Sequence, residues 1–328
     1  MKPYITAKKI IAHNSMLRKG IIPGFICIVL LLAVTKSIVF GQTKPANQYK
    51  IKDVKELKEF FKYTTDRIPL VCGHRGGAKL GYPENAIVTF EHTLSKAAAF
   101  FEVDPRLTKD SVVVVMHDAA LDRTTNGAGN LADFTWEEIR KLKLKDSQGN
   151  ITKYGIHTLD EVIKWSKGKT VLILDKKNVP LEMLLNIITD NQAESHVLVS
   201  SYSPQEAKFY HQRNKDIMFE AFIKNEKQMQ AYEAAGIPWE NIVAYLGQPK
   251  NKELYDALHT KGVMVIIYTG PVYDKIKDTE LRMKTYRDII NSGTDILLSD
   301  KVIDAARALE SLKPLKSQKE RFFSYNQK

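Results

Sequence analysis

Cysteine is scarce in this chain, whose 328 residues contain only Cys27 and Cys72. Two cysteines exclude a disulfide-dense scaffold and a zinc site built from several thiolates, so the fold must be stabilised by its core. Hydrophobic residues make up 44% of the chain, which is enough for a sizeable core and excludes a disordered protein. Acidic residues are missing altogether from residues 1–42, which contain six basic ones.

This acid-free start has the pattern of a secretory signal peptide. Arg18 and Lys19 lead into an apolar run over 21–34, which Lys36 ends. A helix that spans a membrane needs about 20 apolar residues, so the run favours a cleaved leader over residues 1–42. We therefore expect a periplasmic or secreted protein with no stable membrane span. A membrane anchor formed by an uncleaved leader is the less favoured alternative.

Much of the positive charge of the chain belongs to that leader. Without it, 43 basic residues face 38 acidic ones, and the formal net charge falls from +11 to +5. No basic stretch with interleaved aromatic residues remains, so nucleic acid is not an expected partner.

From residue 70 onward, β-branched runs alternate with helical stretches, which is the pattern of an α/β domain with a parallel sheet. The predicted strands are 70–74, 100–107, 170–176, 196–201, 217–222, 242–246, 263–269 and 296–299. These eight strands predict a (β/α)8 TIM-type barrel over residues 67–312. A polar segment over 43–66, with a helix near 54–61, precedes the barrel, and a basic tail over 313–328 follows it.

One further apolar run, 112–116, follows the second strand too closely for a parallel crossover. It must therefore return antiparallel, and a two-residue loop at 109–110 would place His117 opposite Glu102. The polar, turn-rich residues 119–157 that come next predict a small insertion after the second barrel strand.

Acidic residues stand at the ends of two neighbouring predicted strands. Glu102 and Asp104 are two residues apart, so their side chains point to the same face of the sheet. Asp175 and Lys177 repeat this spacing on the next barrel strand. Like charges repel, and a divalent cation is the simplest partner that holds them together. Oxygen ligands without cysteine favour one Ca²⁺ or Mg²⁺, whereas the alternative is an ordinary ion pair with a lysine at each acid.

Two histidines are predicted at the same end of the barrel. His74 ends the first strand, where such barrels carry active-site groups, and Arg75 follows within reach of an anionic ligand. The antiparallel run returns His117 to the acids. A single histidine is more often structural, but two histidines near three acids supply the base and the acid that phosphodiester cleavage needs.

Pro83-Glu84-Asn85 comes before an amphipathic stretch at helical spacing. The pattern predicts Pro83 in the first turn of a helix and Glu84 as a complement to the helix dipole. A role for Glu84 close to the metal is the weaker alternative.

Taken together, these segments resemble the glycerophosphodiester phosphodiesterase family over roughly residues 70–306. Each motif alone is weak, but their order and spacing are specific. The motifs are His74-Arg75-Gly76-Gly77, Pro83-Glu84-Asn85, Glu102-Val103-Asp104, His117-Asp118, Arg123-Thr124-Thr125, Asp175-Lys176-Lys177 and Ser200-Ser201-Tyr202.

The resemblance implies a TIM-type barrel that hydrolyses small glycerophosphodiesters to sn-glycerol 3-phosphate and an alcohol with one divalent cation, commonly Ca²⁺ or Mg²⁺. Direct attack by water and a cyclic phosphate intermediate both stay open. The roles that it implies are general acid and base for His74 and His117, phosphate binding for Arg75 and Lys177, and metal binding for Glu102, Asp104 and Asp175.

Two departures from the family pattern concern the site. Asp175 stands where a glutamate is usual, which shortens the third ligand by one methylene, and Tyr268 stands where a tryptophan is usual, beside the site. The first alternative function is a phospholipase-like enzyme acting on intact lipid or a wall polymer. The second is a non-catalytic binding protein on the same barrel.

Overall fold

The computed structural model describes residues 47–250 and 252–325, which belong to the compact unit Lys44–Lys328. The predicted signal peptide over 1–42 lies outside the described residues. Within the described ranges, no helix has the length and apolar character needed to cross a membrane.

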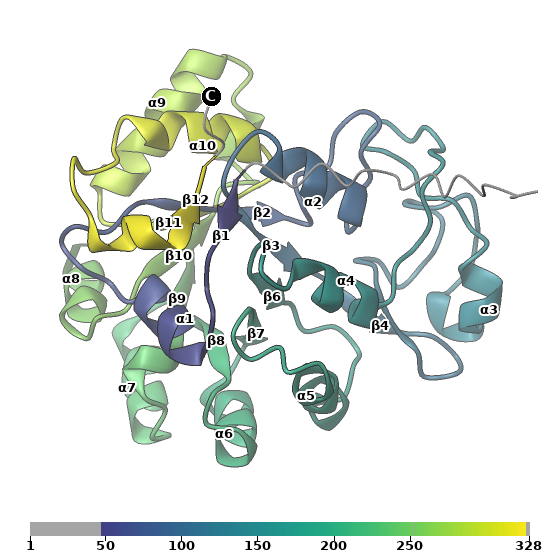
Figure 1. Ribbon diagram of the computed structural model, residues 1–328, viewed down its shortest axis with the longest axis horizontal. Helices are drawn as coiled ribbons and strands as arrows, with labels where there is room; N and C mark the ends of the chain where they lie inside the picture. Colours follow the sequence, from purple (N-terminus) through teal and green to yellow (C-terminus); the bar gives the residue numbers. More distant parts are fainter. Residues whose placement is uncertain (1–46, 251, 326–328) are drawn as a thin grey trace, which may run out of the picture. The chain divides into compact units, whose positions relative to one another are not determined.

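Parallel strands close into a barrel in the order β10-β11-β2-β3-β6-β7-β8-β9 (Figure 1). Their bounds are β2 (Leu70–His74), β3 (Phe100–Val103), β6 (Leu172–Leu174), β7 (Val197–Ser201), β8 (Met218–Phe222), β9 (Ile242–Gly247), β10 (Val265–Tyr268) and β11 (Ile296–Ser299). Every barrel strand coincides with a predicted one, so the TIM-type barrel is confirmed.

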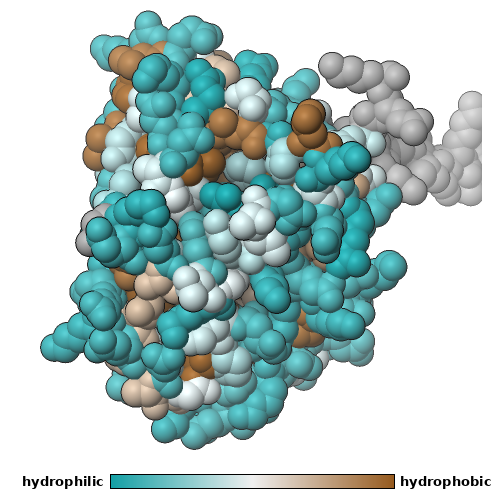
Figure 2. Space-filling model, turned by 90° about the vertical axis from the view of Figure 1, so that its left-hand side faces the viewer, coloured by the Kyte–Doolittle hydropathy of each residue, from teal (hydrophilic) through white to brown (hydrophobic). Residues whose placement is uncertain are grey.

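Helices follow the barrel strands and cover their outer side. Their bounds are α2 (Ile87–Leu94), α4 (Leu159–Ser166), α5 (Leu181–Asp190), α6 (Pro204–Arg213), α7 (Glu226–Ala234), α8 (Lys252–Thr260), α9 (Thr279–Asn291) and α10 (Val302–Glu310). Short 3-10 helices are η1 (Leu131–Asp133), η2 (Trp239–Asn241), η3 (Tyr273–Lys275) and η4 (Gln318–Phe322). Figure 2 shows one side of the molecule, on which hydrophilic residues predominate and hydrophobic ones form small patches.

Alternation along the strands separates two apolar clusters. Phe101 and Val103 pack outward with the helices, whereas Phe100 belongs to the cluster inside the barrel. Because side chains alternate in a strand, Glu102 points inward with Phe100 but lies closer to the carboxyl end. The same alternation that builds the core therefore directs an acid into the barrel.

The antiparallel run forms a hairpin of β4 (Pro105–Leu107) and β5 (Val113–Val115), in which Pro105 pairs with Val115. The predicted two-residue loop, with Glu102 opposite His117, is wrong by one position. The loop has three residues, and its last, Ser111, is left-handed with φ 63°. This is a common three-residue hairpin geometry. The shift brings the Met116 amide to the Asp104 carbonyl at 2.8 Å.

Residues 119–157 form the insertion, which contains α3 (Trp136–Ile139). Its side chains build a small core of their own against β5. The buried members are Ala86, Val114, Met116, Leu121, Leu131, Ile139, Leu144 and Ile156. The insertion therefore supports the hairpin that leads to His117.

The amino-terminal end of the barrel is closed by segments from both ends of the described chain. β1 (Gln48–Tyr49) pairs with β12 (Phe323–Ser324), and α1 (Val54–Phe61) lies beside them (Figure 1). Their aromatic side chains join the cluster inside the barrel. Up to residue 325, the segment expected as a basic tail thus packs on the barrel, because Phe322 and the stem of Lys319 are buried.

Candidate active site

Glu102, Asp104 and Asp175 converge at the carboxyl-terminal end of the barrel. Glu102 lies on β3, Asp104 follows that strand, and Asp175 follows the neighbouring strand β6. One carboxylate oxygen from each acid lies within 4.8 Å of the other two. The predicted convergence of the three acids is therefore present in the structure.

The three acids do not share one electrostatic environment. Burial, and then the negative charges of Asp104 and Asp175, raise the pKa of Glu102 well above its usual value. Burial also opposes ionisation of Asp104, but Lys177 and Arg75 lower its pKa overall. The cluster therefore contains one acid that resists ionisation and one that favours it.

Lys177 is the cation closest to these acids. Its Nζ lies 3.0 Å from Asp104 Oδ1 and 2.5 Å from Asp175 Oδ2, and the two carboxylates raise its pKa against the effect of burial. The ion pair with a lysine that the sequence left open is thus present. However, one ammonium cannot balance three acids, and within the described residues Glu102 forms no ion pair with it. This oxygen-rich, under-compensated set fits Ca²⁺ or Mg²⁺.

Arg75 joins the acids to the first barrel strand. Its backbone N–H donates to Glu102 Oε2 at 3.1 Å, and its Nε lies 3.4 Å from Asp104 Oδ2. Arg75 adopts a left-handed conformation with φ 51°, and Gly76 and Gly77 also have positive φ. A Cβ on Gly77 would lie 2.5 Å from Val302 Cγ2, so the turn tolerates no side chain there. The motif therefore places a cation over the acids by a strained turn.

His74, at the end of β2, is held by two partners from distant parts of the chain. Its Nδ1 lies 2.6 Å from Asp300 Oδ1 and 3.1 Å from the hydroxyl of Tyr268. Burial opposes ionisation of Asp300, but the bond to His74 lowers its pKa overall. With Nδ1 engaged, Nε2 is the nitrogen left for a substrate.

His117 is held in a similar way by its neighbour. Its Nδ1 lies 2.7 Å from Asp118 Oδ1, and Arg123 Nε donates to Asp118 Oδ2 at 2.6 Å. The bond from Arg123 is the main reason that the pKa of Asp118 falls well below its usual value. The Met116 amide, one residue before His117, donates to the Asp104 carbonyl at 2.8 Å, which places the backbone of His117 next to the acids.

Glu84 does not have the predicted role at a helix start. Helix α2 begins at Ile87, and Asn85 is left-handed with φ 54°. The side-chain amide of Asn85 donates to Asp104 Oδ2 at 2.7 Å. This long-range bond prevents a helix from starting at Pro83. Glu84 instead bonds Arg123 twice at 2.8 Å and Arg75 at 3.3 Å. It therefore joins the two cations that flank the site.

An aromatic row lies on the other side of the acids, over β7, β8 and β9. Tyr202 stacks on Phe222 with ring centroids 4.1 Å apart, and Phe222 lies 4.3 Å from Tyr245. The Tyr202 hydroxyl donates to Asp175 Oδ1 at 2.5 Å, which attaches the row to the acids. We call these three residues the aromatic row.

Sequence reasoning missed Glu220, a carboxyl on β8 that is 3% exposed. Burial raises its pKa to about 8, although the Ser200 hydroxyl donates to its Oε2 at 2.6 Å. In the described structure its other oxygen, Oε1, has no hydrogen-bond partner. The available signal was a lone acid within the apolar strand Met218–Phe222.

Eight parallel strands, with three acids, two carboxylate-bound histidines and two cations at their carboxyl ends, define a TIM-barrel protein with its site where such barrels carry active sites. The model of the "Glycerophosphoryl diester phosphodiesterase family" matches residues 74–294, and the chain belongs to this family.

Individual relatives agree with this assignment. The chain is 49% identical to a glycerophosphoryl diester phosphodiesterase from Parabacteroides distasonis, whose crystal structure superposes with a TM-score of 0.84 over 85% of this chain and 99% of that one. It is 27% identical over 256 residues to the glycerophosphodiester phosphodiesterase of Bacillus altitudinis, which covers 74% of this chain and 99% of that protein. A match at 39% identity to the enzyme of the same name from Caldanaerobacter subterraneus subsp. tengcongensis covers 41% of this chain and 58% of that relative's length.

Proposed function

We propose that this protein hydrolyses glycerophosphodiesters to sn-glycerol 3-phosphate and an alcohol, with one divalent cation, Ca²⁺ or Mg²⁺. The proposal depends on one observation: oxygens of three acids lie within 4.8 Å of one another, close to two histidines whose Nδ1 atoms are each bound by a carboxylate. Membership of the family supports the same reaction.

Glu102, Asp104 and Asp175 would hold the cation. Their oxygens suit a hard cation, and all three groups offer a carboxylate oxygen within 4.8 Å of the other two. When bound, the cation would neutralise charge on the substrate phosphate. The side chain of Asp175, which is shorter than the usual glutamate, also contacts Lys177. Asp175 would therefore lie between the cation and Lys177.

Arg75 and Lys177 would bind the phosphodiester. Both cations already face the acids, and a guanidinium offers a fork of donors that matches phosphate oxygens. Glu84 fixes the Arg75 side chain from the opposite side, at 3.3 Å. Substrate orientation would then come from groups that the fold holds in place before binding.

His74 and His117 would move the protons. One Nε2 would accept the proton of the attacking hydroxyl, and the other Nε2 would donate a proton to the leaving alkoxide. Asp300 and Asp118 would hold the rings by their Nδ1 atoms and stabilise the charged form, and Tyr268 would support His74. This set serves water attack and attack by a glycerol hydroxyl equally well.

The proposed cell compartment is supported by the amino-terminal sequence alone. The acid-free, apolar start of the chain supports export and cleavage, and hence a periplasmic or secreted enzyme whose substrate is a deacylated head group outside the cytoplasm. Cell fractionation followed by mass spectrometry of the amino terminus tests it, and an intact leader in the membrane fraction would contradict it.

The decisive experiment is a titration of Ca²⁺ and Mg²⁺ into metal-free protein, with release of sn-glycerol 3-phosphate from glycerophosphocholine as the readout. We expect turnover to require one of the two cations and to stop in excess EDTA. Full turnover in EDTA would overturn the metal assignment. Binding of glycerophosphocholine without product would favour a non-catalytic binding protein.

The aromatic row supports a second candidate, a phospholipase-like enzyme that acts on intact lipid or a wall polymer. Tyr202 is 44% exposed beside Asp175, so apolar surface adjoins the acids. Dispersed phospholipid as substrate distinguishes the two candidates. Turnover of glycerophosphocholine with none on phospholipid would exclude this second one.

A further inference from the structure

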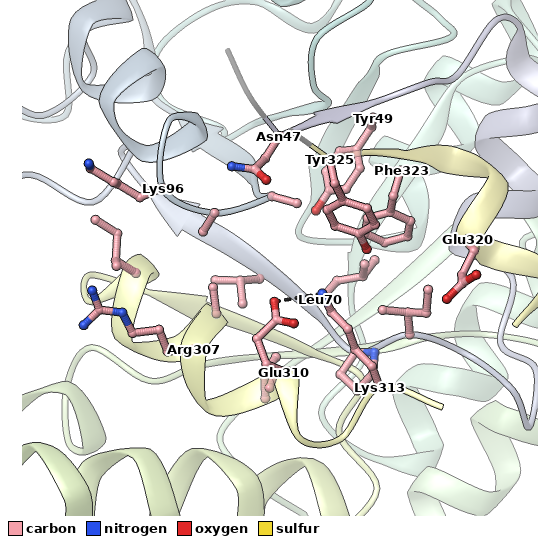
Figure 3. Close-up of a pocket in the computed structure, with 18 residues that line it drawn as sticks. Asn47, Tyr49, Leu70, Lys96, Arg307, Glu310, Lys313, Glu320, Phe323 and Tyr325 are labelled. Carbon is pink, nitrogen blue, oxygen red and sulfur yellow. Dashed lines mark hydrogen bonds and ion pairs between the residues drawn. The ribbon is translucent and has the colours of Figure 1, made fainter. Parts of the chain in front are cut away.

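A groove runs between α2 and α10, outside the barrel wall that carries His74. It consists of two adjoining cavities of about 350 Å³ and 410 Å³, which share Lys96, Ile303 and Arg307. Figure 3 shows the second cavity, with Lys96 and Arg307 at one end and the rings of Phe323 and Tyr325 at the other. We call the pair of cavities the α2–α10 groove.

The first cavity is strongly basic. Lys79, Lys96, Lys301 and Arg307 line it, and over residues 47–250 and 252–325 none of these side chains forms an ion pair. The cavity has two acids in its wall, but both are engaged elsewhere. Asp300 is bound to His74 at 2.6 Å, and Asp304 is bound to Arg282 at 2.6 Å. The cavity wall therefore carries four cations and two acids, and Glu310 and Glu320 line the second cavity. None of the four cations forms an ion pair with these acids within the described residues.

Two lysines on other outer helices are paired instead. Lys164 pairs with Asp160, and Lys284 pairs with Asp288, each one helical turn away. His92 also lies in the wall of the first cavity. Burial lowers its pKa, and the positive charges of Lys79 and Lys96 lower it further. An excess of cations around a concave wall raises the local concentration of anions.

The four cations stand at two levels along the groove. We call Lys79 and Lys301, at the starts of α2 and α10, the upper pair, and Lys96 and Arg307, at their ends, the lower pair. Lys301 precedes α10 and Arg307 lies six residues further, so about 9 Å of helix separates them at 1.5 Å per residue. Lys79 precedes α2 and Lys96 follows it, and both helices run from the acid-bearing end of the barrel toward the other end. The amino terminus of α10 has no side-chain cap, so its first amides add partial positive charge at the upper pair. Two anionic groups on one ligand can therefore be bound together.

We propose that the α2–α10 groove binds a phosphorylated ligand with at least two anionic groups, at a site separate from the barrel mouth. The ligand is either a soluble oligophosphate or the phosphate groups of lipids at a membrane surface, which present the same chemistry. The groove shares Gly77 and Asp300 with the loops that hold His74, so a ligand there lies directly behind the candidate active site. The proposal is independent of the reaction proposed above.

The test uses inorganic tripolyphosphate and orthophosphate as ligands, with EDTA present, and isothermal titration calorimetry. The double variant Lys96→Glu/Arg307→Glu removes the lower pair of cations. Lys141→Glu/Lys227→Glu, at two exposed positions outside the groove, makes the same change in net charge. Because the groove variant replaces two cations by anions where the ligand would bind, we expect it to bind tripolyphosphate roughly tenfold more weakly or worse, and the matched variant less than about threefold.

Two further arms complete the test. Tripolyphosphate binding that disappears in Lys177→Ala alone would place the ligand at the barrel mouth and overturn the proposal, as would equal affinities of the groove and matched variants. Co-sedimentation with phosphatidylglycerol vesicles, compared with phosphatidylcholine vesicles, assigns the source. Co-sedimentation of wild type but not of the groove variant with phosphatidylglycerol vesicles supports lipid as the source of the phosphate groups. If the groove variant binds as well as wild type in both the calorimetric and the vesicle assay, the proposed site is overturned.

Discussion

Buried acids have different hydrogen-bond partners at the two ends of the barrel. At the amino-terminal end, Asp295 is completely buried, yet Arg67, His259 and the Val265 amide all bond its carboxylate. At the carboxyl-terminal end, acids are grouped with acids, burial raises the pKa of both Glu102 and Glu220, and within the described part of the chain Glu220 Oε1 lacks a hydrogen bond. The buried Asp295 at the amino end is thus matched by donors on both carboxylate oxygens, whereas the buried acids at the carboxyl end are only partly matched.

This difference separates stability from function. A buried polar group without a partner costs about 1–3 kcal/mol, so the carboxyl end is less stable than it could be. The amino end offsets that cost with aromatic packing around α1 and β12. We therefore expect substitutions at the carboxyl end to change turnover and substitutions at the amino end to change the free energy of unfolding.

The largest expected effect is on catalysis. His74→Ala and His117→Ala should each lower kcat by roughly 10² to 10⁴ because general acid or base assistance is lost. The free energy of unfolding should change little, since neither ring belongs to the core. Stopped assays of sn-glycerol 3-phosphate release, with urea unfolding in parallel, measure both quantities. His211→Ala on α6 is the control and should retain turnover, and a histidine variant with wild-type kcat would break the comparison.

At the opposite end, Phe60→Ala should act on stability alone. Phe60 is 2% exposed, and its ring lies 4.9 Å from Tyr49 and 5.6 Å from Phe322. Loss of the ring leaves a cavity, and we expect about 3–5 kcal/mol of destabilisation in urea unfolding. Turnover of the folded fraction should stay within about twofold. Leu281→Ala, at an exposed site, is the control and should change neither the free energy of unfolding nor turnover. A large fall in kcat for folded Phe60→Ala would show that the ends are coupled.

The features that the sequence predicts correctly depend on local spacing. β-branched runs identify the barrel strands, and the two-residue step from Glu102 to Asp104 puts both acids on one face. The features that it misses depend on long-range contacts. The bond of His74 to Asp300 joins residues 226 apart and exists only because β11 closes the barrel against β2.

Two further errors have different origins, one long-range and one local. The helix start expected at Pro83-Glu84-Asn85 fails because Asn85 bonds Asp104, and a long-range bond outweighs a local helix preference. The hairpin register fails by one residue because Ser111 accepts a left-handed conformation, which lengthens the loop. The roles proposed for the site residues stay predictions.

Glu220→Gln tests whether a buried acid at the carboxyl end lowers the stability of the fold. The pKa of Glu220 is raised to about 8, so the folded protein keeps this proton between about pH 4.5 and 8 while the unfolded chain releases it. Stability should therefore fall as pH rises through that window. The glutamine variant should be more stable than wild type by about 2–4 kcal/mol at pH 8 and nearly equal to it below pH 4.5. Urea unfolding in EDTA measures this, with Glu253→Gln, at an exposed site, as the control. Parallel pH profiles of wild type and Glu220→Gln would contradict the prediction.

The smallest expected effect concerns Lys319, a charged group at the amino end. Its Nζ donates to the carbonyls of Glu59, Phe60 and Lys62, which lie at the end of α1, and burial lowers its pKa to about 8. Because these carbonyls have a matched donor, Lys319→Met should destabilise the protein by about 1–3 kcal/mol even though it removes a buried charge.

Lys55→Met, on the exposed side of α1, is the matched control for Lys319→Met and should leave the urea midpoint unchanged. A more stable Lys319→Met protein would mean that burial of the charge outweighs its three carbonyl contacts. The amino end would then carry the same kind of electrostatic cost as the carboxyl end. Unchanged kcat together with a lower urea midpoint would instead place Lys319 with Phe60, in the part of the molecule that stabilises the barrel without acting on substrate.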